Sequence, residues 1–332
     1  MRTRNFILIA FVLTVLLSIA VMTIYHASHT HEQTTPVDIP SGTSLRGIAE
    51  ILADHDIISS RSVFIVAAKL TSRSARLKSG LYLFPPSLSI HDALTILVAG
   101  SHQAYRDITI REGLTLRRIA GHLEHVAGFP ADTILYLAHD ADFIRSLGKR
   151  LPSLEGYLFP DTYRMRYDES PRVFLARMAR AMDAVFTDEI VERMRSMRRD
   201  RHEILTMASL VEGETRVPGE RKRVAGVYYN RLRIGMLLQA DPTVQYIIPD
   251  SPRRLLYRDL SIDNPYNTYM YPGLPPGPVN NPGKAAILAS LYPETHDFLY
   301  FVADGRGGHV FTRTLEEHNR AVAEYRRSRR NR

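Results

Sequence analysis

The sequence predicts an α+β protein with an N-terminal apolar helix, small repeated βα units and a mixed α+β C-terminal half. Three observations predict this class: an uncharged apolar segment near the N-terminus, a repeated strand–turn–helix pattern, and a C-terminal half in which helical periodicity alternates with turn-rich stretches. The composition, 45% hydrophobic and 23% charged, is that of an ordinary globular protein. It excludes a largely disordered chain and a protein with many membrane spans.

The apolar segment runs from Phe6 to Ile24 and contains no charged residue. Its length is close to the ~20 residues that a helix needs to cross a bilayer. Residues 1–5 contain Arg2 and Arg4, and positive charge favours the cytoplasmic side, so we expect a cytoplasmic N-terminus and export of the rest. A cleaved signal peptide is the alternative, but its apolar core is usually about 7–15 residues long. We therefore favour a retained transmembrane helix at 6–24.

Residues 25–36 are predicted to form a linker, because their second half is polar and unpatterned. The chain has no cysteine, which excludes a disulfide framework, a thiol nucleophile and a lipidated cysteine anchor. Its formal charge of +8 includes a basic tail at residues 328–332. A basic surface binds nucleic acid, anionic lipid or an acidic polymer, but export argues against nucleic acid as the partner.

A repeat occupies residues 37–150. Fourteen residues starting at Ile39 align with fourteen starting at Ile110, and seven are identical at an offset of 71. In each copy a short strand is predicted to end at a glycine turn, and Ser44 or Thr115 is predicted to cap the helix that follows. The pattern resembles the LysM-type glycan-binding βα unit. The alternative is a structural module that spaces the next domain from the membrane.

Residues 151–327 are predicted to form a separate C-terminal domain. Residues 235–283 are rich in Gly, Pro, Asn and Tyr and contain no long helical pattern; long loops of this kind are usually functional or disordered. Seven tyrosines between Tyr228 and Tyr271 argue against disorder. The periodicity predicts helices at Pro171–Val191, His202–Thr215, Pro218–Arg233, Lys284–Tyr292 and Thr314–Arg327, and a hairpin around residues 304–308.

The helix predicted for His202–Thr215 carries two glutamates. Leu210 and Val211 precede Glu214 by four and three residues, which places Glu214 on the apolar face. Glu212 lies about 200° away around the axis, so the two carboxylates do not share one site. A carboxyl group at the edge of an apolar face loses hydration, and its pKa rises as a general acid requires. Ordinary surface charges at a helix end are the alternative, and periodicity alone does not identify an active site.

Several long motifs resemble the YceG-like family of endolytic murein transglycosylases. They are LTMASLVEGET, VAGVYYNRLRIGMLLQADPTVQY, NPYNTYMYPGLPPGPVNNPG and LYFVADGRGGHVFTRTLEEHN, with EGYLFPDTY upstream. The resemblance covers essentially residues 37 to 325, with the LysM-like units, and the N-terminal anchor that precedes this range is a further similarity. It implies cleavage of the β-1,4 bond between N-acetylmuramic acid and N-acetylglucosamine inside a peptidoglycan strand, with a 1,6-anhydro sugar as the product.

The resemblance implies that Glu214, the second glutamate of the family's E-x-E-T motif, acts as acid and then as base. It would protonate the leaving oxygen and then accept the proton of the muramic acid C6 hydroxyl, which attacks its own C1. A nucleophile inside the substrate has a high effective concentration, so one carboxylate suffices where glycoside hydrolases generally need two. Gly213 departs from the family pattern, in which a larger, often basic residue is expected. Glycine in a helix costs about 1 kcal/mol relative to alanine.

Further motif residues carry amide, hydroxyl, carboxylate or aromatic groups that suit sugar hydroxyl and N-acetyl groups. Glu155 is expected to help shape the substrate cleft, and a structural role is the alternative for each of these residues. No metal and no cofactor are expected, because the histidines show no H-E-x-x-H or similar spacing. The predicted substrate-binding residues are Glu155, Asn230, Gln239, Asp241, Thr243, Asn267 and Tyr269.

Two other functions stay open. One is a non-catalytic peptidoglycan-binding scaffold that serves as a platform for synthases. The other is a muramidase, a hydrolase that would use Glu214 with Glu155 or Asp241. By resemblance, the enzyme would trim nascent strands near the penicillin-binding synthases and so limit glycan length. We expect a single-pass protein of the inner (cytoplasmic) membrane whose catalytic domain lies outside the cytoplasm.

Overall fold

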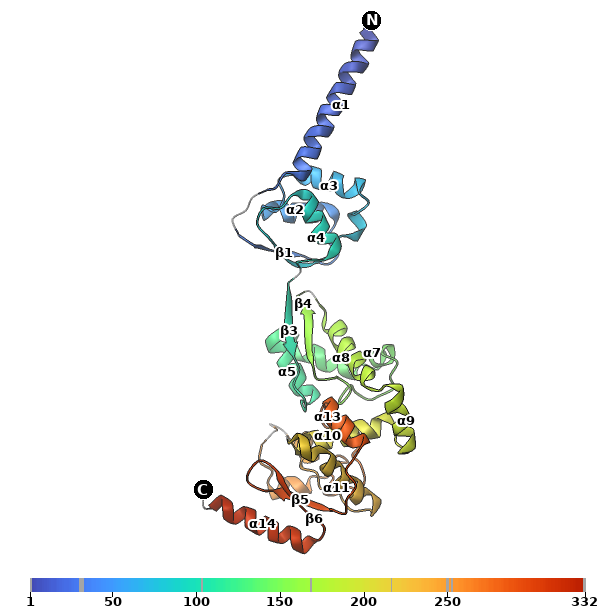
Figure 1. The fold of residues 1–332 in the computed structure, drawn as a ribbon, viewed down its shortest axis with the longest axis vertical. Coiled ribbons are helices and arrows are strands. Elements are labelled where there is room, and N and C mark those ends of the chain that lie inside the picture. The colour runs from blue at the N-terminus through green and yellow to red at the C-terminus, as the bar shows by residue number, and fades with distance from the viewer. Residues whose placement is uncertain are drawn as a thin grey trace. The chain divides into compact units, whose positions relative to one another are not determined.

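The chain folds into two compact units. The computed structural model describes residues 2–29, 33–102, 104–167, 169–215, 217–248, 251 and 253–330, without the side chains of 2–10, 17, 329 and 330. The first unit comprises Met1–Asp107 and Arg164–Ser170, and the second comprises Ile108–Tyr163 and Pro171–Arg332. The chain therefore passes between the units three times: within β3 (Tyr105–Thr109), within β4 (Thr162–Arg166) and between Ser170 and Pro171. The strands β3 and β4 pair as a two-stranded sheet (Figure 1).

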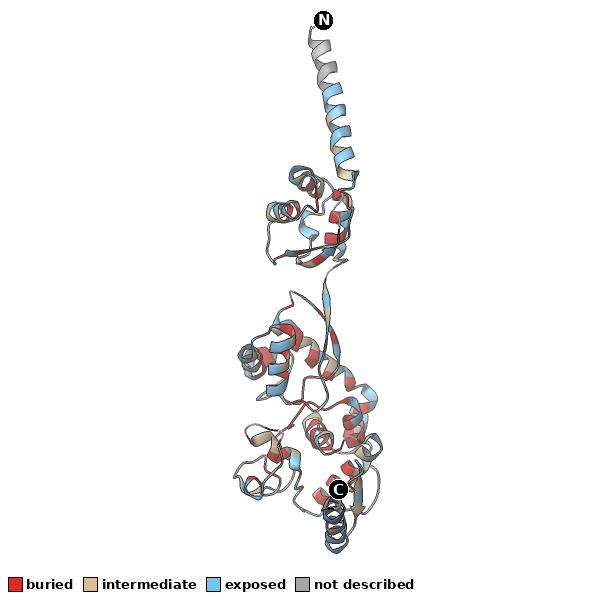
Figure 2. Ribbon diagram, turned by 90° about the vertical axis from the view of Figure 1, so that its left-hand side faces the viewer, coloured by how far each residue is buried: buried red, intermediate tan, exposed pale blue. Residues whose placement is uncertain are grey.

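The first unit begins with α1 (Arg2–His26), which contains the apolar segment predicted at Phe6–Ile24. Residues 6–10 and 17 of that segment lie outside the described side chains. Near the C-terminal end of α1, Val21 and Tyr25 pack against the core of the unit, whereas the rest of its described surface is mostly exposed (Figure 2). Within the described residues, no helix combines the length and apolarity needed to cross a membrane.

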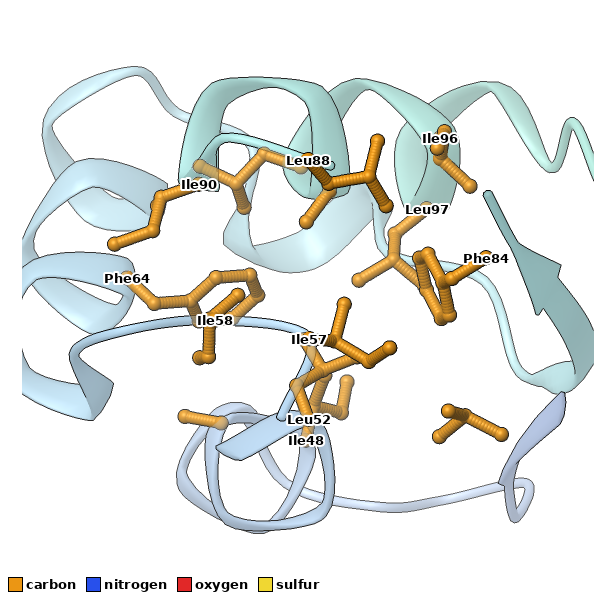
Figure 3. Close-up of a cluster of buried hydrophobic side chains, with 14 of the residues drawn as sticks. Ile48, Leu52, Ile57, Ile58, Phe64, Phe84, Leu88, Ile90, Ile96 and Leu97 are labelled. Carbon is orange, nitrogen blue, oxygen red and sulfur yellow. The ribbon is translucent and has the colours of Figure 1, made fainter. Parts of the chain in front are cut away.

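The first copy of the repeat forms the body of this unit. Its elements are β1 (Thr35–Ile39), α2 (Leu45–Asp54), α3 (Arg61–Leu70), β2 (Gly80–Phe84) and α4 (Ile90–Ala99). β1 and β2 pair antiparallel, and apolar side chains from all five elements form one buried core (Figure 3). Ser44 caps α2 as predicted, because its hydroxyl accepts a hydrogen bond from the Gly47 N–H at 3.1 Å.

The second copy forms β3, α5 (Leu116–Ala127), α6 (Ala131–His139) and α7 (Ala141–Ser146), and β4 follows outside the repeat. Thr115 caps α5 as predicted and accepts the Arg118 N–H at 3.3 Å. Most of this copy belongs to the second compact unit, where α6 packs against α5 and α8. The predicted boundary between residues 150 and 151 therefore falls inside the second unit.

The rest of the second unit is mainly helical. α10, α11 and α13 pack against one another (Figure 1). α12 packs on α10. The predicted hairpin is present as the antiparallel pair β5 and β6. The bounds are α8 (Pro171–Val185), α9 (Asp188–Ser196), α10 (Arg201–Glu214), α11 (Arg221–Arg233), α12 (Asp241–Ile247), α13 (Lys284–Leu291), β5 (Tyr300–Ala303), β6 (His309–Thr312) and α14 (Leu315–Arg330).

Two expectations about these helices were wrong. The single helix predicted for Pro171–Val191 ends at Val185, because Thr187 begins α9 by accepting the Ile190 N–H at 3.5 Å. The helix α10 has no single apolar face either, since every residue from Ile204 to Val211 is buried. It is a core helix, and its sequence periodicity does not separate a buried side from a solvated one.

Candidate active site

Glu214 is the last residue of α10 and is half-buried. Its Oε1 accepts a hydrogen bond from the Tyr228 hydroxyl at 2.7 Å. Tyr228 lies on α11, fully buried, and its ring packs edge-on against Phe301 with 6.0 Å between the centroids. Two neighbouring helices thus bring together one carboxyl group and one hydroxyl donor whose position is set by packing.

Burial raises the pKa of Glu214 to about 7, and the negative charge of Asp241 adds to this effect. Hydrogen bonds from the Tyr228 hydroxyl and the Asp241 backbone, together with the charge of Arg231, act in the opposite direction on this pKa. A carboxyl group with a pKa near 7 both donates and accepts protons at neutral pH. Burial also raises the pKa of Tyr228 well above its usual range, so this hydroxyl remains a donor.

Gly213 allows α12 to approach the end of α10. A Cβ atom at position 213 would lie 2.5 Å from Cγ of Pro242, closer than packed carbon atoms approach. Pro242 follows Asp241, whose backbone N–H reaches the Glu214 carboxyl group. The glycine that departs from the expected family pattern therefore has a packing role here, and it places Asp241 beside Glu214.

Asp241 and Tyr269 form a second polar pair, in which the Tyr269 hydroxyl donates to Asp241 Oδ1 at 2.6 Å. Gln239 is exposed and has a φ of +49°, a conformation that side-chain-bearing residues rarely adopt. Its N–H donates to the Thr268 carbonyl at 3.0 Å, which helps to hold this conformation. Such backbone strain costs on the order of 1–3 kcal/mol and is often found at functional sites.

Arg231 adds a positive charge to the same region. It is buried, and its Nε and Nη1 donate to the carbonyls of Leu299 at 2.7 Å and Leu238 at 2.6 Å. Its charge lowers the pKa of Glu214. Tyr228 and Arg231 are absent from the residues predicted from sequence, although their spacing of three puts both on one side of a helix. That spacing is the signal that could have identified them.

Three of the predicted sugar-binding side chains donate to backbone carbonyls in the structure. Such bonds order the loops around Glu214, and the predicted contacts of these side chains with substrate stay predictions. The bonds run from Asn230 to His296 and Phe298 at 2.7 and 3.1 Å, from Asn267 to Leu260 and Ile262 at 3.0 and 2.9 Å, and from Thr243 to Ala240 at 2.7 Å.

Glu155 is 6% exposed and joins two segments of the second unit. Both of its carboxylate oxygens lie 3.0 Å from the Leu116 N–H, and Asn281 Nδ2 donates to Oε1, also at 3.0 Å. Leu116 is the first residue of α5, where a backbone N–H has no partner within the helix. Burial raises the pKa of Glu155 to about 8. Its predicted role in the substrate cleft stays a prediction.

Glu212 and Glu214 contact different residues, as predicted from their separation of about 200° around the helix axis. Its Oε2 accepts the Gly283 N–H at 3.2 Å, and its Oε1 lies 3.4 Å from Nη2 of Arg221. Burial raises the pKa of Glu212 as well. Glu214 is thus the glutamate of this pair that meets Tyr228 and Asp241.

Comparisons with known proteins show which family the chain resembles. The family model described as the YceG-like family matches residues 37–324. An endolytic murein transglycosylase of Bacillus subtilis (strain 168) is 36% identical over 310 residues, which cover 88% of this chain and 85% of that protein. The enzyme of the same name from Streptococcus pneumoniae serotype 2 (strain D39) is 32% identical over 320 residues, which cover 87% of this chain and 58% of that protein.

One solved structure extends the comparison to the fold. A crystal structure of a yceG-like protein from Listeria monocytogenes matches with a TM-score of 0.61 and 33% sequence identity. The match covers 87% of this chain and 99% of that chain. Both the sequence and the fold therefore resemble the same group of proteins over most of their length.

Proposed function

This chain belongs to the YceG-like family, and we propose from that premise that it is a peptidoglycan lytic transglycosylase with Glu214 as its acid and base. The hydrogen bond between Tyr228 and Glu214 carries the assignment of the site. It holds a desolvated carboxyl group in one orientation, with a donor that does not itself lose its proton. We propose the β-1,4 bond between N-acetylmuramic acid and N-acetylglucosamine as the bond that is cleaved.

The chemistry needs one proton carrier. Protonated Glu214 gives its proton to the glycosidic oxygen while the bond from that oxygen to C1 of the muramic acid breaks. The C6 hydroxyl of the same sugar then attacks C1, and its proton passes to the Glu214 carboxylate. The enzyme returns to its starting state, a 1,6-anhydro ring forms, and no water is consumed. Because the nucleophile is intramolecular, its effective concentration is high.

The neighbours of Glu214 suit the charge changes of this reaction. When Glu214 has lost its proton, Tyr228 donates a hydrogen bond to the resulting carboxylate, and such charge-assisted bonds are the strong ones. Asp241 is exposed and places a second negative charge beside the site. A fixed negative charge stabilises the positive charge that develops at C1 in the transition state. Asp241 is therefore proposed to act electrostatically.

The two alternatives make different products. A muramidase would leave reducing ends, and a scaffold would leave strands intact. Glu155 is poorly placed as a second carboxylate for hydrolysis, because both of its oxygens are engaged by Leu116 and Asn281. Asp241 is exposed and lies beside Glu214, so it remains the candidate second carboxylate of a muramidase. The chemical nature of the product ends distinguishes the two reactions.

The test is mass spectrometry of glycan fragments after purified murein is incubated with the full chain in detergent. We expect internal 1,6-anhydro ends from the wild type and none from Glu214→Gln. Glu192→Gln is the matched control, since Glu192 is an exposed glutamate on α9 that pairs with Arg195. Reducing ends would show a muramidase. Intact strands, under conditions in which a known lytic enzyme cleaves, would favour the scaffold.

The first copy of the repeat is proposed as a glycan contact. Its β1–α2 turn and the segment before β2 border an open hollow lined by Pro40, Ser41, Gly42, Lys78 and Ser79. In a Glu214→Gln background, Ser41→Trp should weaken co-sedimentation with murein, whereas Glu50→Trp on α2 should not. Equal binding by both variants would favour the structural module.

We propose that residues 6–24 anchor the chain in the cytoplasmic membrane, with the N-terminus inside and both units outside. The uncharged segment and the arginines before it support this location. Because the chain has no cysteine, single-cysteine variants report its topology directly. An impermeant maleimide should label Ser28→Cys but not Thr3→Cys in intact cells. Recovery of the wild type in the soluble fraction would contradict the anchor.

Trimming of nascent strands near the penicillin-binding synthases is the proposed biological role, and it rests on the family resemblance. Replacement of the wild type by Glu214→Gln in cells should lengthen the glycan strands. Strand lengths are measured by chromatography of glycan strands after removal of their stem peptides. Unchanged lengths would argue against this role.

A further inference from the structure

We infer that Arg221 is a positioning residue for the catalytic centre, which it orders by holding Glu212 and Glu112 at the junction of three segments. The inference deepens the proposed function and rests on it, because it concerns the same site. The group of Arg221, Glu212 and Glu112 is called the junction cluster below.

The junction cluster places one guanidinium between two carboxylates. Nη2 of Arg221 lies 3.4 Å from Oε1 of Glu212 and 3.9 Å from Oε2 of Glu112. The side chains of Arg221 and Glu212 are 12% and 8% exposed, whereas Glu112 is 47% exposed. The pair of Arg221 with Glu212 is therefore shielded from solvent and screened little by salt, and loss of one partner leaves a desolvated charge without compensation.

The cluster lies where α10 ends and α11 begins. Glu212 precedes Glu214 by two residues on α10, and Arg221 precedes Tyr228 by seven residues on α11. Seven residues are close to two helical turns, so Arg221 and Tyr228 lie on the same side of α11. The two helices therefore meet at two points, first in the junction cluster and again at the hydrogen bond from Tyr228 to Glu214.

A third segment enters through the turn of the second repeat copy. A Cβ atom at Gly283 would lie 1.8 Å from Oε1 of Glu112, so the Glu112 carboxylate rests directly on the bare backbone at that glycine. The Gly283 N–H in turn donates to Glu212 at 3.2 Å. The junction cluster thus fixes the second repeat, α10 and α11 relative to one another within the second unit.

The consequence is a division of roles along two helices. Glu214 and Tyr228 carry the chemistry, and Arg221 sets how the helices that bear them meet. A displacement of about 1 Å at a reacting group is enough to lower turnover by about 100-fold. Loss of Arg221 should therefore lower kcat more than it raises KM, because the inferred role of the residue is exerted through the position of Glu214.

The test compares Arg221→Gln and Arg221→Lys with Arg223→Gln in the full chain. Arg223 lies two residues further along α11 and pairs with Glu294, away from the junction cluster. We expect Arg221→Gln to lower kcat about 10- to 100-fold with KM changed less than about threefold. Lysine should recover part of kcat, and Arg223→Gln should retain it. Wild-type kcat in Arg221→Gln would overturn the inference.

A second readout does not depend on activity. Carbon-13 NMR of labelled glutamate carboxyl groups, assigned with Glu214→Gln, gives the pKa of Glu214 directly. Weakening of the Tyr228 bond in Arg221→Gln should raise that pKa above its value of about 7, since this bond lowers it. An unchanged pKa in the folded variant would also overturn the inference. If Arg221→Gln raises the pKa of Glu214 but the wild type cleaves no murein, the proposed function fails while the positioning role stands.

Discussion

The two copies of the repeat share half of their aligned residues, yet their glycine turns lie in opposite surroundings. In the first copy, a Cβ atom at Gly42 would have no described atom within 4 Å, and the turn borders an open hollow. In the second copy, Leu114 pairs with Asn281 in an antiparallel bridge, and the turn is docked within the second unit. The shared pattern therefore specifies a capped βα turn, and the surroundings decide what the turn does.

The residues that differ between the copies account for this difference. Ser41 and Thr43 of the first turn align with Glu112 and Leu114 of the second. Leu114 is buried, and Glu112 rests on Gly283. An apolar side chain and a carboxylate thus replace two small hydroxyl residues, which converts an open turn into a docked one. The identical positions maintain the fold of each copy, and the variable ones set its partner.

The largest expected effect comes from the docking of the second turn. Asn281 is fully buried, accepts the Leu158 N–H and donates to Leu114 and Glu155. Asn281→Ala should lower the stability of the second unit by about 3 kcal/mol, since it leaves several buried polar groups without partners. Hydrogen exchange should show this loss in α10 and α13 and leave β1 and α2 unchanged. Asn319→Ala, at an exposed asparagine of α14, is the control.

The next effect is a pH response of opposite sign in the two units. Burial raises the pKa of Glu155 from 4.5 to about 8, so its contribution to stability is present below pH 4.5 and is lost as the pH rises towards 8. The Ser89 hydroxyl lowers the pKa of Asp92 in the first unit from 3.8. That contribution is present above pH 3.8 and is lost on further acidification.

Protection factors from hydrogen exchange at several pH values would check this difference. Between pH 5 and 8 the second unit should lose stability while the first stays constant. Glu155→Gln should reduce the response of the second unit, and the part that is left comes from Glu212 and Glu214, whose pKa values are also raised. An equal decline in both units would argue that the two turns are held by similar contacts.

The smallest expected effect is a difference in turnover between alanine variants of Gly42 and Gly113, the glycines at matching positions of the two repeat copies. Gly42 and Gly113 have φ values of +82° and +73°, so alanine at either position should cost about 1 kcal/mol. Only Gly113→Ala should also lower turnover, because strain in this turn acts on the adjoining Glu112 and on the Leu114–Asn281 bridge. The new Cβ atom itself would make only an ordinary van der Waals contact with Cγ of Glu212, at 3.5 Å. Turnover measured at matched folded fractions is the check. Equal activity in both variants would show that docking of the second turn does not influence the active site.

The elements that obey local rules were predictable from sequence. Ser44 and Thr115 cap the predicted helices, and the turn at residues 304–308 joins the predicted strands, because caps and turns depend on neighbouring residues. The break between α8 and α9 was missed, since the helical period continues past the cap at Thr187.

The active site was predictable only in part. Family motifs singled out Glu214, whose catalytic role is a proposal, but the apolar-face argument for it does not hold, because α10 is buried all round up to Val211. Its hydrogen-bond donor Tyr228 comes from the next helix, and the contact of Gly213 with Pro242 joins segments far apart in the sequence. Such contacts depend on tertiary packing, which periodicity in one segment does not encode.

The return of the chain to the first unit at residues 164–170 bears on how the protein is made. The first unit includes Arg164–Ser170, so its last segment follows the first 56 residues of the second unit, residues 108–163. Synthesis proceeds from the N-terminus at about 5–20 residues per second. Residues 164–170 are therefore added to the first unit on the order of seconds after residue 107 has been made. Until then β3 has been made but β4 has not. A nascent chain at that stage carries an unpaired strand edge, the feature that chaperones and neighbouring chains recognise.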